Sequence, residues 1–292
     1  MTKITEQRNI LSENLDNLDP IEILQIINSE DAILHKSIEK NINKINKVVE
    51  IVIESFKNHG SLYYVGAGTS GRLGVLDASE CPPTFKADIN MVQGIIAGGT
   101  KALYESIEGA EDSFEKGADI IKNKKINSKD SVIGISASGS AAFVLGALKK
   151  SSELGAYTCL ITFNKIKKEY YIKDLLSTNV GPEIITGSTR MKAGTATKMI
   201  LNMISTTSMI KSNKIYKNYM VDLKVSNKKL KKRAINIINE LTGLDYFKSE
   251  ELLQLAHNNV KASLVMNHLS IDYKQALCEL NKFNGNLRKI LD

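Results

Sequence analysis

The feature that most constrains the fold of this chain is an alternation of short apolar runs with helical segments. The runs are rich in β-branched residues and lie at Leu62–Val65, Val92–Ala97, Val132–Ser136 and Tyr157–Thr162, with a weaker fifth at Asn179–Ile185. Helical patterns separate them, at Arg72–Ser79, Ser113–Lys124, Ala141–Leu154 and, less regularly, Lys167–Leu176. Apolar strands joined by helices are typical of a parallel sheet covered on both faces. The sequence therefore predicts an α/β fold, a three-layer α/β/α sandwich with a five-stranded parallel sheet.

Helical patterns also flank this region. Asp19-Pro20 provides a cap and a proline at the first helical position, and apolar residues recur at helical spacing as far as Ile53, with a break near Asn28-Ser29-Glu30. A long helix is expected from Thr189 to about Lys211, and short helices follow it. We therefore predict an N-terminal helical segment (residues 1–58), a central domain (59–241) and a small C-terminal helical subdomain (242–292).

Composition excludes several classes of protein. No run of eighteen apolar residues appears, so no membrane span is expected, and the polar N-terminus lacks the build of a signal peptide. The three cysteines show no CxxC spacing, which fits a cytoplasmic, reducing environment. The four histidines are scattered, so no metal site is expected. The net charge of +7 gathers partly in Lys228–Arg233, but without interleaved aromatics this indicates a solvated helix face rather than nucleic-acid binding.

A glycine-rich loop, Gly66–Gly71, follows the first strand and opens a helix. Its GxGxxG spacing matches a dinucleotide fingerprint, but the second strand ends in Ile96–Gly99 without the acid that would hold a ribose. The hydroxyls of Thr69 and Ser70, beside Gly68 and the N–H groups of a helix start, favour a phosphate or sugar ligand instead. A plain tight turn is the alternative.

Two later loops have a similar character. Ser136, Ser138 and Ser140 follow the third strand in a small hydroxyl-rich turn. The carboxyl ends of parallel strands share one edge of a sheet. We therefore expect this turn and the glycine-rich loop Gly66–Gly71 to belong to one candidate site for an anionic substrate. The second later loop follows the fifth expected strand, and we expect it to form another wall of this site. Its candidate residues are Glu183, Ser188, Thr189, Arg190 and Lys192. A capped helix with surface cations is the alternative.

Two acidic segments provide candidates for proton transfer. The paired prolines Pro82-Pro83 predict that a helix ends near Glu80, and a glutamate shielded from water there would keep its proton and act as a general acid. An ordinary exposed glutamate is the alternative. The segment Glu105–Asp112 holds four carboxylates, and the spacing of these residues does not select one of them over a solvated acidic face.

Several of these segments carry a resemblance to a known family. Tyr64–Phe85, Glu108–Asp112, Val180–Thr195, Thr5–Asn9 and Ile27–Asp31 resemble the signature segments of the N-acetylmuramic acid 6-phosphate etherases, and the similarity extends over nearly the whole chain. The family is related to the glucokinase regulatory protein and belongs to the sugar isomerase (SIS) superfamily. The resemblance implies a SIS fold, a phosphosugar substrate, a homodimer, and no metal or other cofactor.

The resemblance also implies the catalytic residues and the reaction. Glu80 corresponds to the family's proton donor, and Glu111 to its second catalytic carboxylate. The implied lyase reaction cleaves the ether between C3 of the sugar and D-lactate, giving N-acetylglucosamine 6-phosphate and D-lactate in amino sugar catabolism and peptidoglycan recycling. We assign Glu111 to removal of the C2 proton and Glu80 to protonation of the leaving oxygen.

The chain departs from the family pattern at two places. Ser140-Ala141-Ala142 stands where the family usually carries an Arg-Thr-Pro-like stretch, and Lys86 stands where glycine is expected. The alternatives to the etherase are a phosphosugar isomerase on the same fold and a non-catalytic phosphosugar-binding regulator. A sugar-responsive DNA binder would need a helix-turn-helix ahead of the sheet, and residues 1–59 do not show one.

Overall fold

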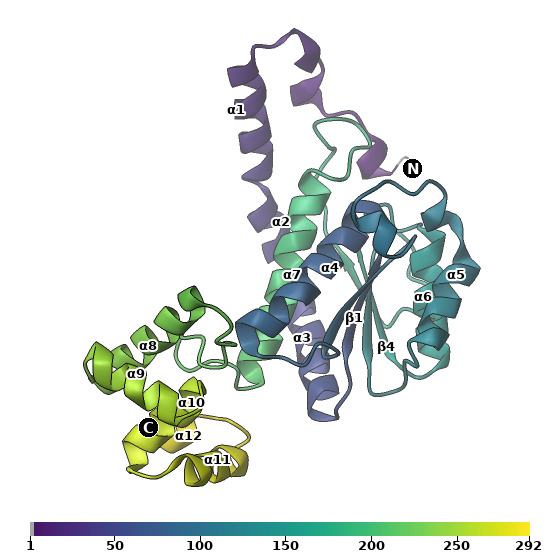
Figure 1. Ribbon diagram of the computed structural model, residues 1–292. Helices are drawn as coiled ribbons and strands as arrows, with labels where there is room; N and C mark the ends of the chain where they lie inside the picture. Colours follow the sequence, from purple (N-terminus) through teal and green to yellow (C-terminus); the bar gives the residue numbers. More distant parts are fainter. Residues whose placement is uncertain (1–2) are drawn as a thin grey trace. The chain divides into compact units, whose positions relative to one another are not determined.

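The computed structural model describes residues 3–292 and confirms the predicted α/β architecture (Figure 1). One parallel sheet has the strand order β2-β1-β3-β4-β5. Reversal of the strand order next to β1 creates a crevice at the carboxyl ends of β1 and β3, where ligands bind in folds of this type. The strands are β1 (Leu62–Gly66), β2 (Val92–Ile96), β3 (Ser131–Ile135), β4 (Tyr157–Thr162) and β5 (Asp174–Ser177).

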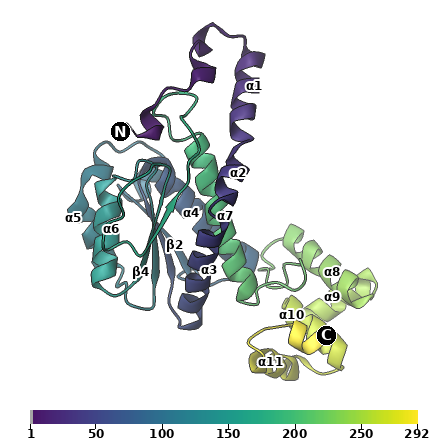
Figure 2. The ribbon, with the colours of Figure 1, turned by 180° about the vertical axis from the view of Figure 1, so that it is seen from behind.

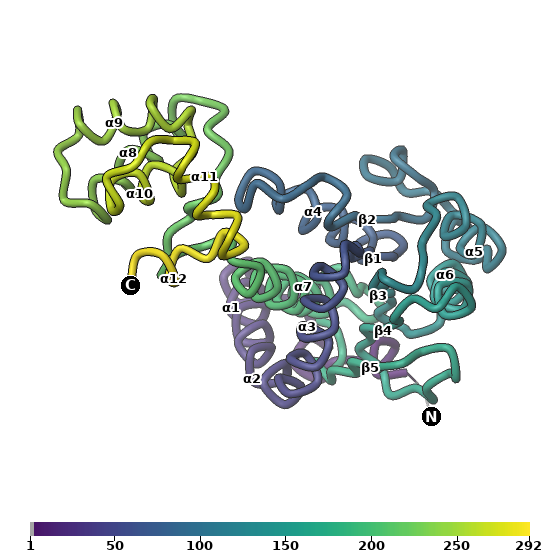
Figure 3. The backbone as a smooth tube through the Cα atoms, turned by 90° about the horizontal axis from the view of Figure 1, so that it is seen from below, coloured from purple at the N-terminus to yellow at the C-terminus, as the bar shows by residue number. Residues whose placement is uncertain are grey.

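Helices cover both faces of the sheet, as Figure 3 shows from below. On one face lie α5 (Phe114–Asn123) and α6 (Ala142–Glu153). On the other lie α4 (Gly68–Phe85), α3 (Ile42–Lys57) and α7 (Lys192–Lys211), the last two side by side (Figures 2 and 3). Helix α7 confirms the long helix predicted to run from Thr189 to about Lys211.

Two glycines set the close packing of α5 on α6. A Cβ atom at Gly117 would lie 1.9 Å from the carbonyl oxygen of Phe143, and one at Gly146 would lie 2.0 Å from that of Phe114. The two helix backbones therefore approach more closely than any side chain at these positions would allow.

The N-terminal region begins with three short 3₁₀ helices, η1 (Ile4–Glu6), η2 (Ile10–Ser12) and η3 (Leu15–Asn17), and continues with α1 (Pro20–Asp31) and α2 (Leu34–Glu39). The predicted cap at Asp19 is present as a capping box with Glu22. The break between α1 and α2 falls at residues 32–33, a few residues later than expected.

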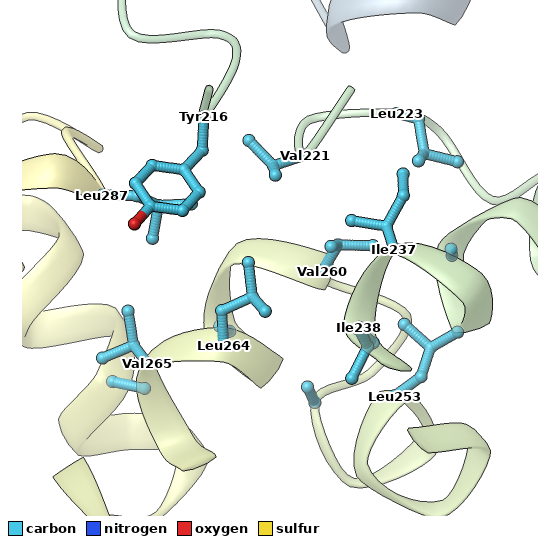
Figure 4. Close-up of a cluster of buried hydrophobic side chains, with 14 of the residues drawn as sticks. Tyr216, Val221, Leu223, Ile237, Ile238, Leu253, Val260, Leu264, Val265 and Leu287 are labelled. Carbon is cyan, nitrogen blue, oxygen red and sulfur yellow. The ribbon is translucent and has the colours of Figure 1, made fainter. Parts of the chain in front are cut away.

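The chain divides into two compact units, one of residues up to Ser79 with Asn90–Ser208, and a second of Glu80–Ile89 with Met209–Asp292. The second unit contains α8 (Lys228–Thr242), α9 (Tyr246–Leu255), α10 (Val260–Leu269), α11 (Tyr273–Lys282) and α12 (Arg288–Leu291). Its own apolar core includes Ile237, Ile238, Leu253, Leu264 and Leu287 (Figure 4). The expected subdomain boundary at residue 242 thus lies at the end of α8, inside this unit.

Two predictions about the fifth strand were wrong. The strand is Asp174–Ser177, which overlaps the end of the segment expected to be helical (Lys167–Leu176), and Asn179–Ile185 forms no strand. Gly181, at φ 73°, and Pro182 interrupt the later segment, whereas Tyr157 donates a hydrogen bond from its hydroxyl to Asp174 across the β4–β5 pair at 2.9 Å. An edge strand with this polar contact lacks the apolar, β-branched pattern that marks a buried strand.

The prediction that Pro82 and Pro83 end a helix near Glu80 was also wrong, because α4 runs on to Phe85. Proline removes hydrogen-bond donors from this last turn, but Cys81 and Phe85 are both buried, and their packing holds the turn. Lys86, the residue directly after the helix, has a φ of 48°, in the left-handed region. This conformation explains why glycine is the residue expected at that position.

No helix among residues 3–292 is long and apolar enough to span a membrane.

Candidate active site

A cavity of about 280 Å³ opens where the loops after β1 and β3 meet, at the crevice that the strand order creates. It brings together seven of the residues predicted from sequence, which come from four separate segments. They are Gly68, Thr69, Ser70, Glu111, Ser136, Ser138 and Thr189. The remaining wall consists of Glu6, Ala67, Ile135, Ala137, Ala141 and Gly187.

The loop after β1 depends on glycine at two positions. A Cβ atom at Gly66 would lie 2.6 Å from the backbone nitrogen of Gly71, and Gly68 has a φ of 52°, which L side chains rarely adopt. The tight turn places Thr69 and Ser70 at the start of α4, where helix N–H groups and the helix dipole favour an anion.

The loop after β3 is a small network of hydroxyl groups. The Ser138 and Ser140 hydroxyl oxygens lie 3.0 Å apart, and the backbone N–H of Ser140 donates to the Ser138 oxygen at 3.3 Å. The Ser136 hydroxyl oxygen accepts the N–H of Ala141 at 3.3 Å, which organises the entry into α6. Ser136 and Ser138 line the cavity, whereas Ser140 is exposed beside it and accepts a hydrogen bond from Lys3.

The geometry distinguishes among the four carboxylates of Glu105–Asp112. Glu111 lines the cavity, from a short 3₁₀ turn (Ala110–Asp112) that follows Gly109. Glu105 and Glu108 line only a smaller hollow of about 230 Å³, whose wall also includes Glu111. Glu111, which is exposed, is therefore the one acid of this segment that faces the hydroxyl-lined loops.

The loop that carries Glu111 is tied to the start of α4 by Arg72. The guanidinium Nε donates to the carbonyl oxygen of Leu103 at 3.2 Å, and Nη2 donates to that of Glu105 at 2.8 Å. Two donors from one planar group fix both the position and the orientation of this loop.

Other predicted site residues lie outside the cavity wall. Glu183 is 1% exposed and accepts the backbone N–H groups of Lys192 and Ala193, both at 2.9 Å, at the start of α7. Burial raises the pKa of the Glu183 carboxyl, and these two N–H groups oppose the shift. The Lys192 ammonium group is buried against Glu30, with Nζ 2.5 Å from Oε2. Glu183 and Lys192 thus hold the segment that presents Thr189 to the cavity.

Ser188, Arg190 and Glu80 are also absent from the cavity wall. Ser188 is half-buried and Arg190 is exposed. Glu80 belongs to the second compact unit, where it is exposed. In the described part of the chain, no group of three or more His, Cys, Asp or Glu side chains is placed to hold a metal ion.

Sequence reasoning missed Glu6 as a cavity residue. Its carboxylate faces the same space as Glu111, although the two residues are far apart in the chain. The segment Thr5–Asn9 carries part of the family resemblance, and it is the only signal in the sequence that points to this region.

Comparisons with known proteins fit this geometry. Two family models match, the "Glucokinase regulatory protein N-terminal SIS domain" at residues 44–152 and the "C-terminal lid domain of glucokinase regulatory protein" at residues 217–278. N-acetylmuramic acid 6-phosphate etherases of Bacillus cereus (strain AH820) and Bacillus mycoides (strain KBAB4) are 49% identical over 288 residues, which is 98% of this chain and 98% of each relative.

Solved structures give weaker matches. The sugar isomerase domain of an RpiR transcription factor from Sphaerobacter thermophilus aligns with a TM-score of 0.44 and 14% identity, over 64% of this chain and 92% of that one. The Vibrio vulnificus NanR protein complexed with ManNAc-6P gives a TM-score of 0.44 and 14% identity, over 69% and 68%.

Proposed function

The chain belongs to the N-acetylmuramic acid 6-phosphate etherase family of carbon–oxygen lyases, and we propose that it cleaves the lactyl ether of N-acetylmuramic acid 6-phosphate. The products are N-acetylglucosamine 6-phosphate and D-lactate. The observation that carries the proposal is the position of Glu111, a carboxylate in a cavity otherwise lined mainly by glycine and hydroxyl loops. The family points to amino sugar catabolism and peptidoglycan recycling, and we place the reaction in the cytoplasm.

The cavity suits a sugar phosphate. Thr69, Ser70, Ser136 and Ser138 offer hydroxyl donors from the two loops, and the starts of α4 and α6 add backbone N–H groups. A phosphate monoester carries close to two negative charges near pH 7 and accepts several hydrogen bonds. We place the phosphate at these loops and the sugar ring toward Glu111.

The chemistry needs a base and an acid. In the open-chain aldose the C2 proton is acidic because the carbonyl lies next to it. Glu111 removes this proton, and the electron pair forms a C2–C3 double bond as the C3–oxygen bond breaks. Glu80 protonates the departing lactyl oxygen, since an alkoxide is a poor leaving group. Glu80 then takes a proton from the water that adds to C3, and C2 regains a proton. Each carboxylate returns to its starting state, and no cofactor is consumed.

The length of helix α4 indicates which cavity Glu80 can serve. The helix starts at the cavity with Gly68, and Ser79 lies about 17 Å farther along its axis. Glu80 follows Ser79 directly, so we expect the acid for one cavity to come from a second copy of the chain. Leu76, on the same helix, is 50% exposed and offers an apolar contact for that copy. The proposed active form is therefore a homodimer.

A non-catalytic phosphosugar-binding regulator is the second candidate, because both matched family models are named for the glucokinase regulatory protein. The presence of Glu111 in the cavity and 49% identity to etherases along 98% of the chain favour the enzyme. A phosphosugar isomerase would use one carboxylate base in the same way, but it would release no lactate.

Isotope labelling tests the proposed reaction. In H₂¹⁸O, we expect the label at the C3 hydroxyl of the sugar product, while D-lactate keeps the original ether oxygen. In D₂O, deuterium should enter at C2. A chelator should leave the rate unchanged. Appearance of ¹⁸O in lactate would contradict elimination followed by hydration.

A further inference from the structure

The N-terminal segment Lys3–Asn9 contributes Glu6 to the cavity wall, and Thr5 anchors the first half of the segment. Thr5 is 1% exposed. Its backbone N–H donates to Asn164 Oδ1 at 3.3 Å, Asn164 Nδ2 donates to its hydroxyl at 3.0 Å, and its carbonyl oxygen accepts the N–H of Gly187 at 3.1 Å. These contacts join the segment to the loop after β4 and to the cavity residue Gly187.

Asn9 anchors the other end of the segment. Its Nδ2 donates to Glu30 at 2.6 Å and to the carbonyl oxygen of Pro182 at 3.2 Å. Because both ends of the segment are fixed by these hydrogen bonds, Glu6 is presented to the cavity by a segment with little freedom to move away.

Lys3 brings a positive charge to the hydroxyl-rich loop after β3. Its Nζ donates to the Ser140 hydroxyl at 2.7 Å, and that hydroxyl lies 3.0 Å from the one of Ser138, which lines the cavity. The ammonium group is therefore linked through two hydroxyl groups, those of Ser140 and Ser138, to the space where we place the phosphate.

The charges of the cavity favour such a cation. Its wall contains two carboxylates, Glu6 and Glu111, and within the described chain none of its lining residues is a lysine or arginine. A phosphate dianion placed there would meet two like charges without a compensating one.

We propose that the N-terminal segment is part of the substrate site, where Lys3 binds the phosphate of the substrate and Glu6 accepts a hydrogen bond from an O–H or N–H group of its sugar. The proposal rests on the proposed function for the identity of the sugar. The role of Lys3 does not depend on that identity, because it requires only that an anion binds at the Ser136–Ser140 loop. Lys3 thus recognises the charge of the substrate, and Glu6 recognises a neutral hydrogen-bond donor.

The test compares Lys3→Gln and Glu6→Gln in the full-length protein. Both side chains are exposed, and each substitution keeps the approximate size of the side chain. Lys40→Gln and Glu39→Gln, two adjacent exposed residues at the end of α2, are matched controls. Two quantities are measured, the KM for N-acetylmuramic acid 6-phosphate and the dissociation constant of inorganic phosphate by calorimetry, which requires no turnover.

Lys3→Gln is expected to weaken phosphate binding and to raise KM, each about tenfold, as the loss of one charge-assisted hydrogen bond predicts. Glu6→Gln is expected to raise KM without weakening phosphate binding. Wild-type phosphate affinity in Lys3→Gln, or a wild-type KM in Glu6→Gln, would overturn the corresponding half. If the wild type binds phosphate but releases no lactate, the proposed function fails, and the effect of Lys3→Gln on phosphate still decides the role of Lys3.

Discussion

The guanidinium of Arg72 donates a hydrogen bond to the main-chain carbonyl oxygen of Glu105 at 2.8 Å, which ties the first turn of α4 to the loop that carries Glu111. One side of the cavity is thus linked to the other by a side chain that does not line it. The contact joins residues that are 33 positions apart. We regard Arg72 as a positioning residue that acts through Glu111.

Replacement of Arg72 should therefore impair catalysis more than binding. Arg72→Gln is expected to lower kcat about ten- to hundredfold, because a small displacement of a catalytic group has effects of this size. KM should change little, and Arg72→Lys should recover part of the loss through one remaining donor. Lys101→Gln, which removes an exposed ion pair with the side chain of Glu105, is the control. A KM increase with unchanged kcat in Arg72→Gln would argue against positioning.

The proposed division of the catalytic pair between two chains predicts complementation. Glu80→Gln and Glu111→Gln should each be inactive alone. When they are mixed and allowed to exchange subunits, half of the dimers are mixed and each contains one complete site, so activity should return to about a quarter of wild type. Mixed dimers that are shown to form, by differently tagged subunits, but stay inactive would place both carboxylates in one chain.

The buried pair of Lys192 and Glu30 predicts a large effect on stability. Glu30→Ala leaves the Lys192 ammonium group buried without its counter-charge, and the free energy of unfolding should fall by about 3–5 kcal/mol. Glu54→Ala removes the exposed pair with Lys57 and should cost less than about 1 kcal/mol. Chemical denaturation measures both. Equal losses in the two variants would contradict a structural role for the buried pair.

Asp77 predicts a dependence of stability on pH. Burial raises the pKa of its carboxyl above the ordinary 3.8, although Asn202 and Ser205 donate to Oδ1 at 2.6 Å and 3.1 Å. The native state therefore holds a proton that the unfolded chain releases at lower pH. Stability contributed by this proton is lost as pH rises from about 3.8 through the raised pKa. Unfolding measured across this range should show a shallower decline in Asp77→Asn than in the wild type, and equal slopes would exclude Asp77 as the cause.

The close contact between α5 and α6 predicts that a single methyl group added at Gly146 destabilises the fold. Gly146→Ala places a carbon 2.0 Å from the carbonyl oxygen of Phe114 and should lower the free energy of unfolding by about 1–3 kcal/mol. In Gly194→Ala the nearest atom lies 3.5 Å away, an ordinary contact, so this variant serves as the control within a helix. Thermal melts that show no difference between the two variants would contradict the close packing.

The parts of the fold that sequence predicts well are those with local signals. The turn at Gly68, the hydroxyl loop at Ser136–Ser140 and the long α7 each follow from residues that are neighbours in the chain. Strand β5 was missed because an edge strand that includes Asp174 lacks the apolar pattern of a buried one.

The site is harder to predict because distant contacts assemble it. Glu111 was assigned from family resemblance, and its selection over Glu105 and Glu108 depends on how the loop folds beside α4, where Arg72 holds it. Glu6 reaches the cavity because Thr5 binds Asn164, a contact between residues 159 positions apart. No periodicity or local motif encodes such a relationship.

The central claim is tested most directly by measuring D-lactate release from N-acetylmuramic acid 6-phosphate by the purified protein, with Glu111→Gln alongside. We expect the wild type to release D-lactate and N-acetylglucosamine 6-phosphate in equal amounts, and the variant to release neither at a measurable rate. Saturable binding of the phosphosugar by the wild type, without any lactate, would contradict the account and identify the protein as a phosphosugar-binding regulator.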